Sequence, residues 1–328
     1  MKNRILSGMR PTGQLHLGHL VGALDNWVRL QDDYECFFMI ADWHALMSEY
    51  EAPSVISQVT LDNLADWLAA GIDPKKSVIF IQSEVPQHLD LNMILSCLTP
   101  LGWLERCPTY KEQLKQLSNR NIKTYGFLGY PVLQAADILL YKANKVPVGE
   151  DQLPHLELTR EIARRFNNLY KKKILPDPSA LLTASPRLLG LDNRKMSKSF
   201  NNTINLSDSP DIIKSKIQNM FTDPKRIKLT DSGHPDECNV FSYYKVFIHG
   251  REKEVYNWCK KALKGCTDCK RILAEGLITR LKIHQKRRMF WIKNEAQLKK
   301  ILNQGRQRAC EVASKTMDQV KEAICFKR

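Results

Sequence analysis

Residues 4–19 read RILSGMRPTGQLHLGH. The apolar run at residues 4–7 is typical of a buried β-strand, and apolar positions recur at helical spacing over residues 18–31. The stretch between them therefore joins the end of a strand to the start of a helix, the place where open α/β sheets bind nucleotides. Exposed backbone amides and the positive end of the helix dipole favour phosphate there. The sequence thus predicts a nucleotide site on an α/β sheet.

The same alternation continues along the first half of the chain. Apolar runs at residues 36–42 and 78–82 predict further buried strands, and residues 53–70 predict a helix that Gly71-Ile72-Asp73-Pro74 interrupts. Strand–helix–strand alternation indicates a parallel α/β sheet. We therefore expect a Rossmann-like catalytic domain.

Helical segments then interrupt this alternation. Residues 85–145 predict a helical insertion, an amphipathic helix follows at residues 150–170, and helical patterns dominate after about residue 205. We expect the catalytic domain to span residues 1–200 and an all-α domain to span residues 201–328.

The composition is that of an ordinary globular protein. Of the 328 residues, 43% are hydrophobic and 26% are charged, which argues against intrinsic disorder. The longest apolar runs, at residues 36–41 and 138–141, are far shorter than the roughly 20 residues of a membrane-spanning helix. The N-terminus also lacks the sustained apolar segment of a secretory signal. We expect a cytoplasmic protein with no membrane partner.

The formal net charge of +15 is unevenly distributed. Residues 1–200 have a net charge of +2, whereas residues 201–328 carry 27 basic and 14 acidic residues, a net charge of +13. A solvated basic surface is the simple explanation. The alternative is a region that binds a polyanion, because clustered Lys and Arg release counterions from phosphates.

A second polar motif lies within residues 186–202, which show little periodicity and are expected to form an exposed loop. It reads Arg194-Lys195-Met196-Ser197-Lys198-Ser199. Two lysines beside small hydroxyl residues are suited to hold a pyrophosphate group as charge builds on it, although a charged loop is often only solvated. In the first motif, His16 and His19 are suited to donate hydrogen bonds to phosphate oxygens. The alternative is two ordinary histidines on the surface of a helix.

The two motifs, in this order and at this separation, resemble the two signatures of class I aminoacyl-tRNA synthetases. The chain further resembles the bacterial-type tryptophanyl-tRNA synthetases, and two late blocks distinguish it from the sister tyrosyl enzymes. The resemblance implies activation of L-tryptophan by ATP, transfer to tRNA(Trp), and no editing domain. The matching residues lie at 11–13, 18–24, 42–45, 130–131, 135–141, 147–152, 155 and 157–160.

The resemblance also implies which residues hold ATP. Lys195 and Lys198 are expected to grip the leaving pyrophosphate together with Mg²⁺, and no protein nucleophile is needed. The turn at residues 149–151 is expected to contact the ribose, and Leu188 the adenine. The expected catalytic residues are His16, His19, Lys195 and Lys198, and the expected ATP-binding residues are Arg10, Pro11, Thr12, Gly18, His19, Gly149, Glu150, Asp151, Leu188, Lys195, Met196, Ser197, Lys198 and Ser199.

For tryptophan, the resemblance implies that Asp137 accepts a hydrogen bond from the indole N–H. A buried carboxylate left without a donor is costly, so such a site penalises phenylalanine, which has no ring donor. Tyr130, His44 and Gln152 are expected to line the pocket or to bind the ammonium group, with ordinary packing as the alternative.

Two positions depart from the pattern of many bacterial members. Arg10 stands where Gln is common, and Gln134 stands where Met is common. Both are expected at the mouth of the active site, with Gln134 among the tryptophan-binding residues. We expect Arg10 to contact an ATP phosphate.

Four of the nine cysteines form a pattern. Cys238, Cys259, Cys266 and Cys269 are spaced C-x20-C-x6-C-x2-C, and four thiolates suit either tetrahedral Zn²⁺ or an iron–sulfur cluster. A minority of tryptophanyl-tRNA synthetases carry a very similar motif that holds a [4Fe–4S] cluster beside the anticodon-binding surface. The resemblance therefore implies a [4Fe–4S] cluster, with Zn²⁺ or four unliganded thiols as alternatives. The isolated cysteines, expected to be inert, are Cys36, Cys97, Cys107, Cys310 and Cys325.

The resemblance implies a homodimer paired through residues 85–145 and an anticodon-binding role for residues 201–328. Lys286, Arg287 and Arg288 are candidate tRNA contacts by charge, and a solvated helix face explains them equally well. The rival functions are a nucleotidyltransferase of the same superfamily and a non-catalytic RNA-binding or iron-sensing protein. Tryptophan-dependent ATP–pyrophosphate exchange separates the three.

Overall fold

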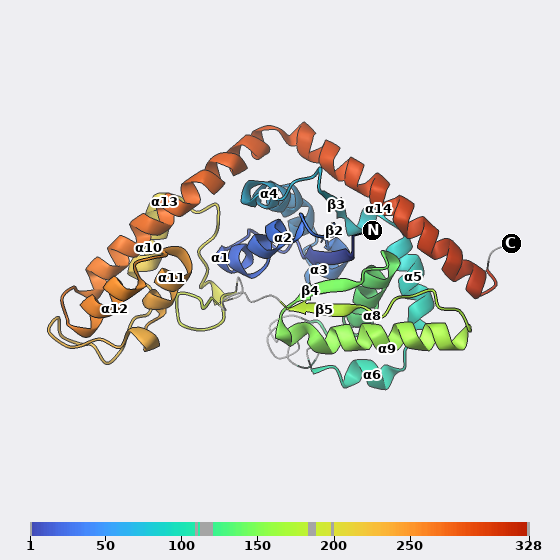
Figure 1. Cartoon of the computed structure of the whole chain (residues 1–328), viewed down its shortest axis with the longest axis horizontal. Coiled ribbons are helices and arrows are strands. Elements are labelled where there is room, and N and C mark those ends of the chain that lie inside the picture. The colour runs from blue at the N-terminus through green and yellow to red at the C-terminus, as the bar shows by residue number, and fades with distance from the viewer. Residues whose placement is uncertain (1, 109–110, 112–120, 183–187, 198–199, 327–328) are drawn as a thin grey trace.

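A five-stranded parallel sheet forms the centre of the molecule (Figure 1). The computed structural model describes residues 2–108, 111, 121–182, 188–197 and 200–326. The strand order is β3-β2-β1-β4-β5, which confirms the predicted fold class. The strands are β1 (Arg4–Met9), β2 (Glu35–Ile40), β3 (Ser77–Ile81), β4 (Lys145–Val148) and β5 (Ser179–Leu182).

The first three strands confirm the predicted apolar runs, whereas β4 and β5 were not predicted. Both missed strands have only four residues, and β4 contains a proline. Too few apolar positions are present in either for a pattern to emerge.

Alternate strand residues face two separate hydrophobic layers. Ile5, Phe38 and Ile79 belong to the hydrophobic layer on one face of the sheet. Leu6 and Phe37 belong to the layer on the other face. The first layer contains α1 (Leu17–His19), a π-helical turn (Leu20–Leu24), α2 (Asp25–Leu30) and α4 (Ser54–Ala70). The second layer contains α5 (Gln87–Ser96), α6 (Leu101–Glu105), α8 (Tyr125–Leu140) and α9 (Leu153–Leu169).

Two predicted helix ends are explained by local backbone geometry. Gly71 adopts φ +115° at the end of α4, a left-handed conformation that favours glycine, and so confirms the predicted break. The helix predicted from residue 150 begins instead at Leu153, because Glu150–Gln152 forms a 3₁₀ turn. Helix α3 (Asp42–Glu49) follows β2 directly.

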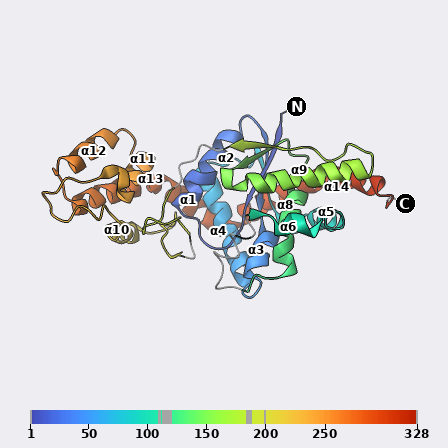
Figure 2. The same cartoon turned by 90° about the horizontal axis from the view of Figure 1, so that it is seen from below.

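The chain after residue 205 is helical, as predicted, and its shorter helices lie at one end of the molecule (Figure 2). These helices are α10 (Pro210–Gln218), α11 (Asn239–Phe247) and α12 (Glu252–Lys260). Helices α10 and α11 pack against α13 (Cys266–Lys293), and α12 packs against α11. Within the described ranges, no helix is both long and apolar enough to cross a bilayer.

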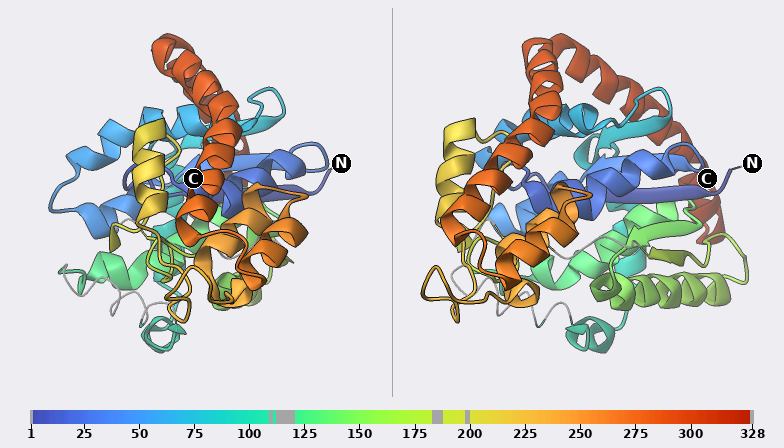
Figure 3. Two further views of the ribbon diagram at one scale, coloured as in Figure 1. Left: turned by 90° about the vertical axis from the view of Figure 1, so that its left-hand side faces the viewer. Right: turned by 60° about the vertical axis from the view of Figure 1, so that its left-hand side comes forward.

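The last helix, α14 (Glu295–Ala323), returns to the sheet. Figure 3 shows α13 and α14 meeting at an elbow, after which α14 runs back along the edge strand β3. Ala309, Ala313 and Met317 of α14 are buried in the same layer as α5, α8 and α9. The expected division at residue 200 did not foresee this packing, because the helical pattern of α14 does not show which layer its apolar face covers.

Candidate active site

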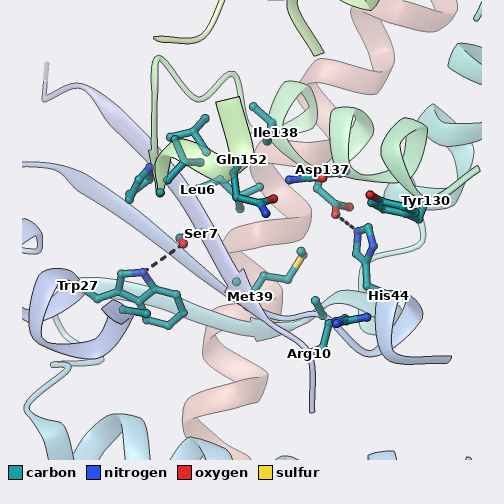
Figure 4. A pocket seen from close by; sticks show the side chains of 18 of the residues that line it. Leu6, Ser7, Arg10, Trp27, Met39, His44, Tyr130, Asp137, Ile138 and Gln152 are labelled. Atoms are coloured by element: carbon teal, nitrogen blue, oxygen red, sulfur yellow. Dashed lines mark hydrogen bonds and ion pairs between the residues drawn. The ribbon is translucent and has the colours of Figure 1, made fainter. Parts of the chain in front are cut away.

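A cavity of about 440 Å³ opens where the strand order reverses. Within the sheet, β2 and β3 lie on one side of β1, and β4 and β5 lie on its other side. The carboxyl ends of β1, β2 and β4 line the cavity, as expected for a ligand site in an open α/β sheet (Figure 4). The structure brings seven predicted residues together in its wall: Arg10, His44, Tyr130, Gln134, Asp137, Gly149 and Gln152.

Asp137 on α8 is the most heavily hydrogen-bonded carboxylate of this wall. It is 2% exposed, and it accepts from His44 Nε2 at 2.8 Å and from His88 Nδ1 at 2.6 Å. Gln82 Nε2 donates to its two oxygens at 2.8 and 3.0 Å. Burial alone would raise the pKa of Asp137, but the hydrogen bonds and charges of His44 and His88 bring it below its ordinary value. The cavity therefore has an ionised, acceptor-only group in its wall.

A buried tyrosine extends this network. Tyr141 Oη lies 2.8 Å from His88 Nε2, and burial, followed by the charge of Asp137, raises the pKa of Tyr141 well above its ordinary value. The phenol therefore stays protonated and donates to Nε2, while His88 donates from Nδ1 to Asp137. No role was predicted for Gln82, His88 or Tyr141 from the sequence. Gln82 directly follows a buried strand, a position that could have identified it, but His88 carries no local signal.

Tyr130 is held by a second buried network. Its hydroxyl lies 2.9 Å from His155 Nε2, and Cys107 Sγ lies 3.5 Å from His155 Nδ1. Burial lowers the pKa of His155 to about 4, so the imidazole is neutral at physiological pH. Burial also raises the pKa of Tyr130, which keeps its hydroxyl protonated. Cys107, expected to be an inert isolated thiol, thus contacts the group that orients a pocket residue.

His16 and His19 form a compact start to α1. Their ring centres are 3.8 Å apart, His16 Nδ1 accepts from the Gly18 amide, and His19 Nδ1 accepts from the His16 amide, both at 3.1 Å. A Cβ at Gly18 would lie 3.0 Å from the His16 ring and 3.4 Å from Met196 Sδ. The two sequence motifs therefore meet at this glycine. Among the described residues that line the cavity, none is Pro11, Thr12, His16, Gly18 or His19.

The second motif lies in a loop whose described part folds around Asn202. The Asn202 side chain accepts from the Ser197 amide at 2.9 Å and donates to the Lys195 carbonyl at 3.1 Å. Lys195 is exposed, as expected, but Leu188, Met196 and Asn202 are buried. The expectation of a wholly exposed loop is therefore wrong at these positions, because the loop supplies apolar side chains to the core. Lys198 and Ser199 lie outside the described residues.

The turn at residues 149–151 approaches the cavity through Gly149. Glu150 and Asp151 are exposed, and Gln152 Nε2 donates to Asp151 Oδ2 at 3.2 Å. A Cβ at Gly149 would lie 2.7 Å from Asp151 Oδ1, so the turn closes tightly at this position.

The four predicted cysteine ligands come from three neighbouring elements. Cys238 precedes α11, Cys259 belongs to α12, and Cys266 and Cys269 occupy the first turn of α13. Burial, together with the other three sulfurs, raises the pKa of Cys269 to about 12, so all four thiols interact electrostatically. Across the described part of the chain, however, no group of three or more His, Cys, Asp or Glu side chains has metal-holding geometry.

Of the three candidate tRNA contacts on α13, one is occupied within the fold. Arg288 pairs with Asp62 at 3.2 Å and with Asp66 at 3.1 Å on α4, so its charge joins two helices. Lys286 and Arg287 are exposed.

Comparisons with known proteins agree on one family. The family model described as tRNA synthetases class I (W and Y) matches residues 1–282. A tryptophan–tRNA ligase of Thermotoga maritima is 48% identical, with 98% of each chain covered, and one of Ralstonia nicotianae is 41% identical at the same coverage. The crystal structure of a Campylobacter jejuni tryptophanyl-tRNA synthetase with ADP and tryptophan superimposes with a TM-score of 0.88 at 35% identity, covering 98% of this chain and 99% of that one.

Proposed function

Since the chain belongs to the class I tRNA synthetases for tryptophan and tyrosine and acts as a tryptophan–tRNA ligase, we propose a division of labour among its residues. The cavity binds L-tryptophan, and the loops beside it bind ATP. A tryptophan carboxylate oxygen attacks the α-phosphorus of ATP, and the bond to pyrophosphate breaks. A terminal ribose hydroxyl of tRNA(Trp) then attacks the acyl carbon and releases AMP. The protein acts in the cytoplasm, where these substrates meet.

Asp137 is the residue that selects tryptophan. The single observation that carries this assignment is an ionised carboxylate, 2% exposed, in the cavity wall with donors from His44, Gln82 and His88. These donors fix the carboxylate in place, and an indole N–H supplies a further donor from the cavity. Phenylalanine has no such donor and leaves the buried acceptor poorly satisfied.

The Asp137→Asn variant tests this role in tryptophan-dependent ATP–pyrophosphate exchange. A lost charge-assisted hydrogen bond is worth about 1.5–3 kcal/mol, so kcat/KM for tryptophan should fall roughly 10- to 100-fold. The KM for ATP should stay within about twofold of wild type. Asp211→Asn, which makes the same change on exposed α10, is the matched control. Exchange driven equally well by tyrosine, or an Asp137→Asn variant equal to the control, would overturn the assignment.

The ATP site combines the two motifs that meet at Gly18. His16, Gly18 and His19 lie at a helix start, which favours phosphate, and Pro11 and Thr12 lie in the turn that precedes it. Lys195 and Lys198 stabilise the pyrophosphate as it leaves, and Mg²⁺ bound with ATP neutralises part of the phosphate charge. Gly149–Asp151 contacts the ribose of ATP, and Leu188, which lies in the loop, contacts the adenine.

Arg10 is proposed to contact an ATP phosphate. It is exposed at the end of β1 and lines the cavity, and its charge acts on Tyr130. Arg10→Gln should raise the KM for ATP several-fold while the KM for tryptophan changes little, which initial-rate exchange measurements resolve. An unchanged KM for ATP and an unchanged rate would show that Arg10 has no such contact.

The four-cysteine group is proposed to hold a [4Fe–4S] cluster, with Zn²⁺ as the alternative. Four thiols from three elements fit either group by donor chemistry. Gly233 adds a structural reason, since a Cβ there would lie 2.4 Å from Cys259 Sγ and only glycine leaves room beside the sulfur. A bound cluster would join α11, α12 and α13 covalently.

Metal analysis after anaerobic purification tests the cysteine group. About four irons with matching sulfide per chain would establish the cluster, and one zinc per chain would establish the alternative. Cys269→Ser should abolish metal binding. Cys97→Ser, which changes an exposed cysteine in the N-terminal half of the chain, should not alter it. No metal in the wild-type protein would leave four structural thiols.

The homodimer is proposed to form through α5, α6 and α8. Met93, Leu101 and Tyr125 are large side chains on these helices that are 63%, 63% and 80% exposed, and a second copy of the chain would cover them. Met93→Glu should convert a dimer to a monomer in analytical ultracentrifugation. Ile283→Glu, at an equally exposed position on α13, should leave the dimer intact. A monomeric wild type would refute the pairing.

The basic region after residue 200 is proposed to bind the anticodon arm of tRNA(Trp). Its charge of +13 supports contact with a phosphate backbone, which supplies affinity. Lys286 and Arg287 remain candidate contacts, whereas Arg288 is engaged by α4.

A further inference from the structure

Helix α11 lies between the loop of the second motif and the four-cysteine group. It begins directly after Cys238, and it packs against α12 and α13, which carry the other three cysteines. Three of its polar side chains, Asn239, Tyr243 and Tyr244, are buried and point to one or the other of these two segments. None of them is explained by substrate binding in the cavity.

Asn239 and Tyr243 bind the loop. Asn239 Nδ2 donates to the Gly190 carbonyl at 2.6 Å, and Tyr243 Oη donates to the Leu189 carbonyl at 2.7 Å. Ser242 Oγ donates to the Asn239 backbone carbonyl at 2.7 Å and also lies 3.2 Å from Asn239 Oδ1. Asn239 is 2% exposed and Tyr243 is fully buried, so both donors act where their side chains are shielded from water. The Gly190 carbonyl also accepts from the Asn193 amide at 3.1 Å.

The bound carbonyls lie next to the motif itself. Leu189 pairs with Lys195 in an antiparallel bridge, and the Gly190 amide donates to the Arg194 carbonyl at 2.7 Å. A Cβ at Gly190 would lie 2.2 Å from Asn202 Nδ2, and Asn202 in turn holds the backbone at Lys195 and Ser197. A displacement of residues 189–190 would therefore move Lys195.

Tyr244, the next residue of α11, binds the other segment. Its hydroxyl donates to the Cys269 carbonyl at 2.7 Å, and its ring packs edge-on against Trp258, the neighbour of Cys259. Consecutive side chains of one helix thus hold the loop and the cysteine group. The loop and the cysteine group are therefore both hydrogen-bonded to α11.

We propose that Asn239 and Tyr243 are positioning residues that hold residues 189–197 for ATP, and that α11 makes this geometry depend on an ordered cysteine group. The proposal rests on the proposed ATP role of the Lys195 loop. It assigns the cysteine group an effect on adenylate formation, a step that requires no tRNA.

Two readouts test the positioning residues in the full-length protein. Tyr243→Phe removes one hydroxyl, and a lost buried hydrogen bond should raise the KM for ATP about five- to twentyfold, with the KM for tryptophan unchanged. Limited trypsin cleavage after Arg194 or Lys195 should accelerate by a similar factor. Tyr256→Phe in α12, whose ring packs on Phe241, is the matched control. Asn239→Ala should reproduce both effects.

The link to the cysteine group is tested by Tyr244→Phe and by Cys269→Ser. Both variants should accelerate trypsin cleavage after Arg194 or Lys195 and raise the KM for ATP, although the hydroxyl of Tyr244 binds the Cys269 carbonyl and not a carbonyl of the loop. Cleavage and KM values equal to those of Tyr256→Phe would overturn the link, and a defect confined to tRNA binding would do the same.

The outcomes also separate this inference from the proposed function. A wild-type protein without tryptophan-dependent exchange would refute the proposed function, while the cleavage rates would still measure whether α11 holds the loop. Normal exchange in the wild type together with unaltered Tyr243→Phe and Asn239→Ala variants would refute the inference alone.

Discussion

Asp137 shows how a buried charge is made usable at the scale of single residues. An isolated carboxylate in this wall would be protonated by burial, yet His44, Gln82 and His88 donate four short contacts to its two oxygens. Each donor is itself fixed by the fold, most clearly His88, which Tyr141 holds from its other nitrogen. The acceptor that faces the cavity is therefore ionised and held in one orientation by its donors.

Tyr141→Phe tests whether this support reaches the substrate. The change removes the donor to His88 Nε2 and leaves a buried acceptor unpaired, at a cost of about 1–2 kcal/mol. We expect kcat/KM for tryptophan to fall roughly 5- to 20-fold in pyrophosphate exchange, with the KM for ATP unchanged. Tyr170→Phe, whose ring packs on Phe166, is the control. Equal values for the two variants would show that Tyr141 serves packing alone.

His155 predicts a pH dependence of stability. Its pKa is about 4 in the fold, below the ordinary value of 6.5, so between these values the unfolded chain takes up a proton that the folded chain does not. Stability is therefore complete above about pH 6.5 and is lost as the pH falls toward 4, by up to roughly 3 kcal/mol. His155→Gln should flatten this loss in urea unfolding between pH 7.5 and 4.5. The same slope in wild type and variant would contradict the prediction.

Among the helices and strands, the contact between α14 and β3 has the strictest steric requirement. A Cβ at Gly305 would lie 1.7 Å from the Ile79 carbonyl oxygen, so the helix backbone rests directly on the edge strand. This approach covers the open edge of the sheet, which would otherwise present unpaired backbone groups. A glycine within a long helix is thus explained by its neighbour, since helix propensity alone disfavours it.

Gly305→Ala should therefore destabilise the protein by about 3 kcal/mol or more, because neither backbone can yield without disturbing the sheet. Gly276→Ala on α13 is a matched control, since its Cβ meets only the flexible end of Ile248. Alanine also favours a helix by about 1 kcal/mol over glycine, so this control should be near neutral. Chemical denaturation of both variants measures the difference. Similar losses in the two would show that the α14 contact adjusts freely.

At the scale of the whole molecule, charge is separated from the cavity. Residues 201–293, which include α10 to α13, carry 19 basic and 10 acidic residues, whereas residues 1–200 are nearly balanced. The helices that carry this charge lie at the end of the molecule away from α9 (Figure 2). The excess positive charge and the cavity therefore lie in different parts of the molecule.

This separation predicts unequal salt dependence. Between about 50 and 200 mM salt, the Kd for tRNA(Trp) should rise at least tenfold, because several phosphates release counterions on binding. Tryptophan-dependent exchange without tRNA should change far less over the same range. Lys286→Gln should reduce the salt slope for tRNA by about one, since it removes one exposed cation. A parallel salt dependence of both reactions would place the basic surface outside tRNA binding.

The amino-acid sequence is enough to predict the parallel sheet, the strand-to-helix turn at residues 7–19 and several residues of the cavity wall. Continuous apolar runs specify buried strands, whereas Arg10, His44, Tyr130, Asp137 and Gln152 were predicted from the resemblance of the chain to a known family. The strands and the turn depend on residues that are neighbours in the sequence, so the sequence alone is enough to predict them.

The hydrogen bonds and packing that hold these residues in place depend on contacts between distant parts of the chain. His88 reaches Asp137 across 49 positions and Asn239 reaches Gly190 across 49 positions, while α14 reaches β3 from the far end of the chain. Such contacts leave no periodic trace, because each depends on the distance and direction between side chains of separate elements. Local pattern determines which side chains are buried, and the packing of distant segments determines which of them meet.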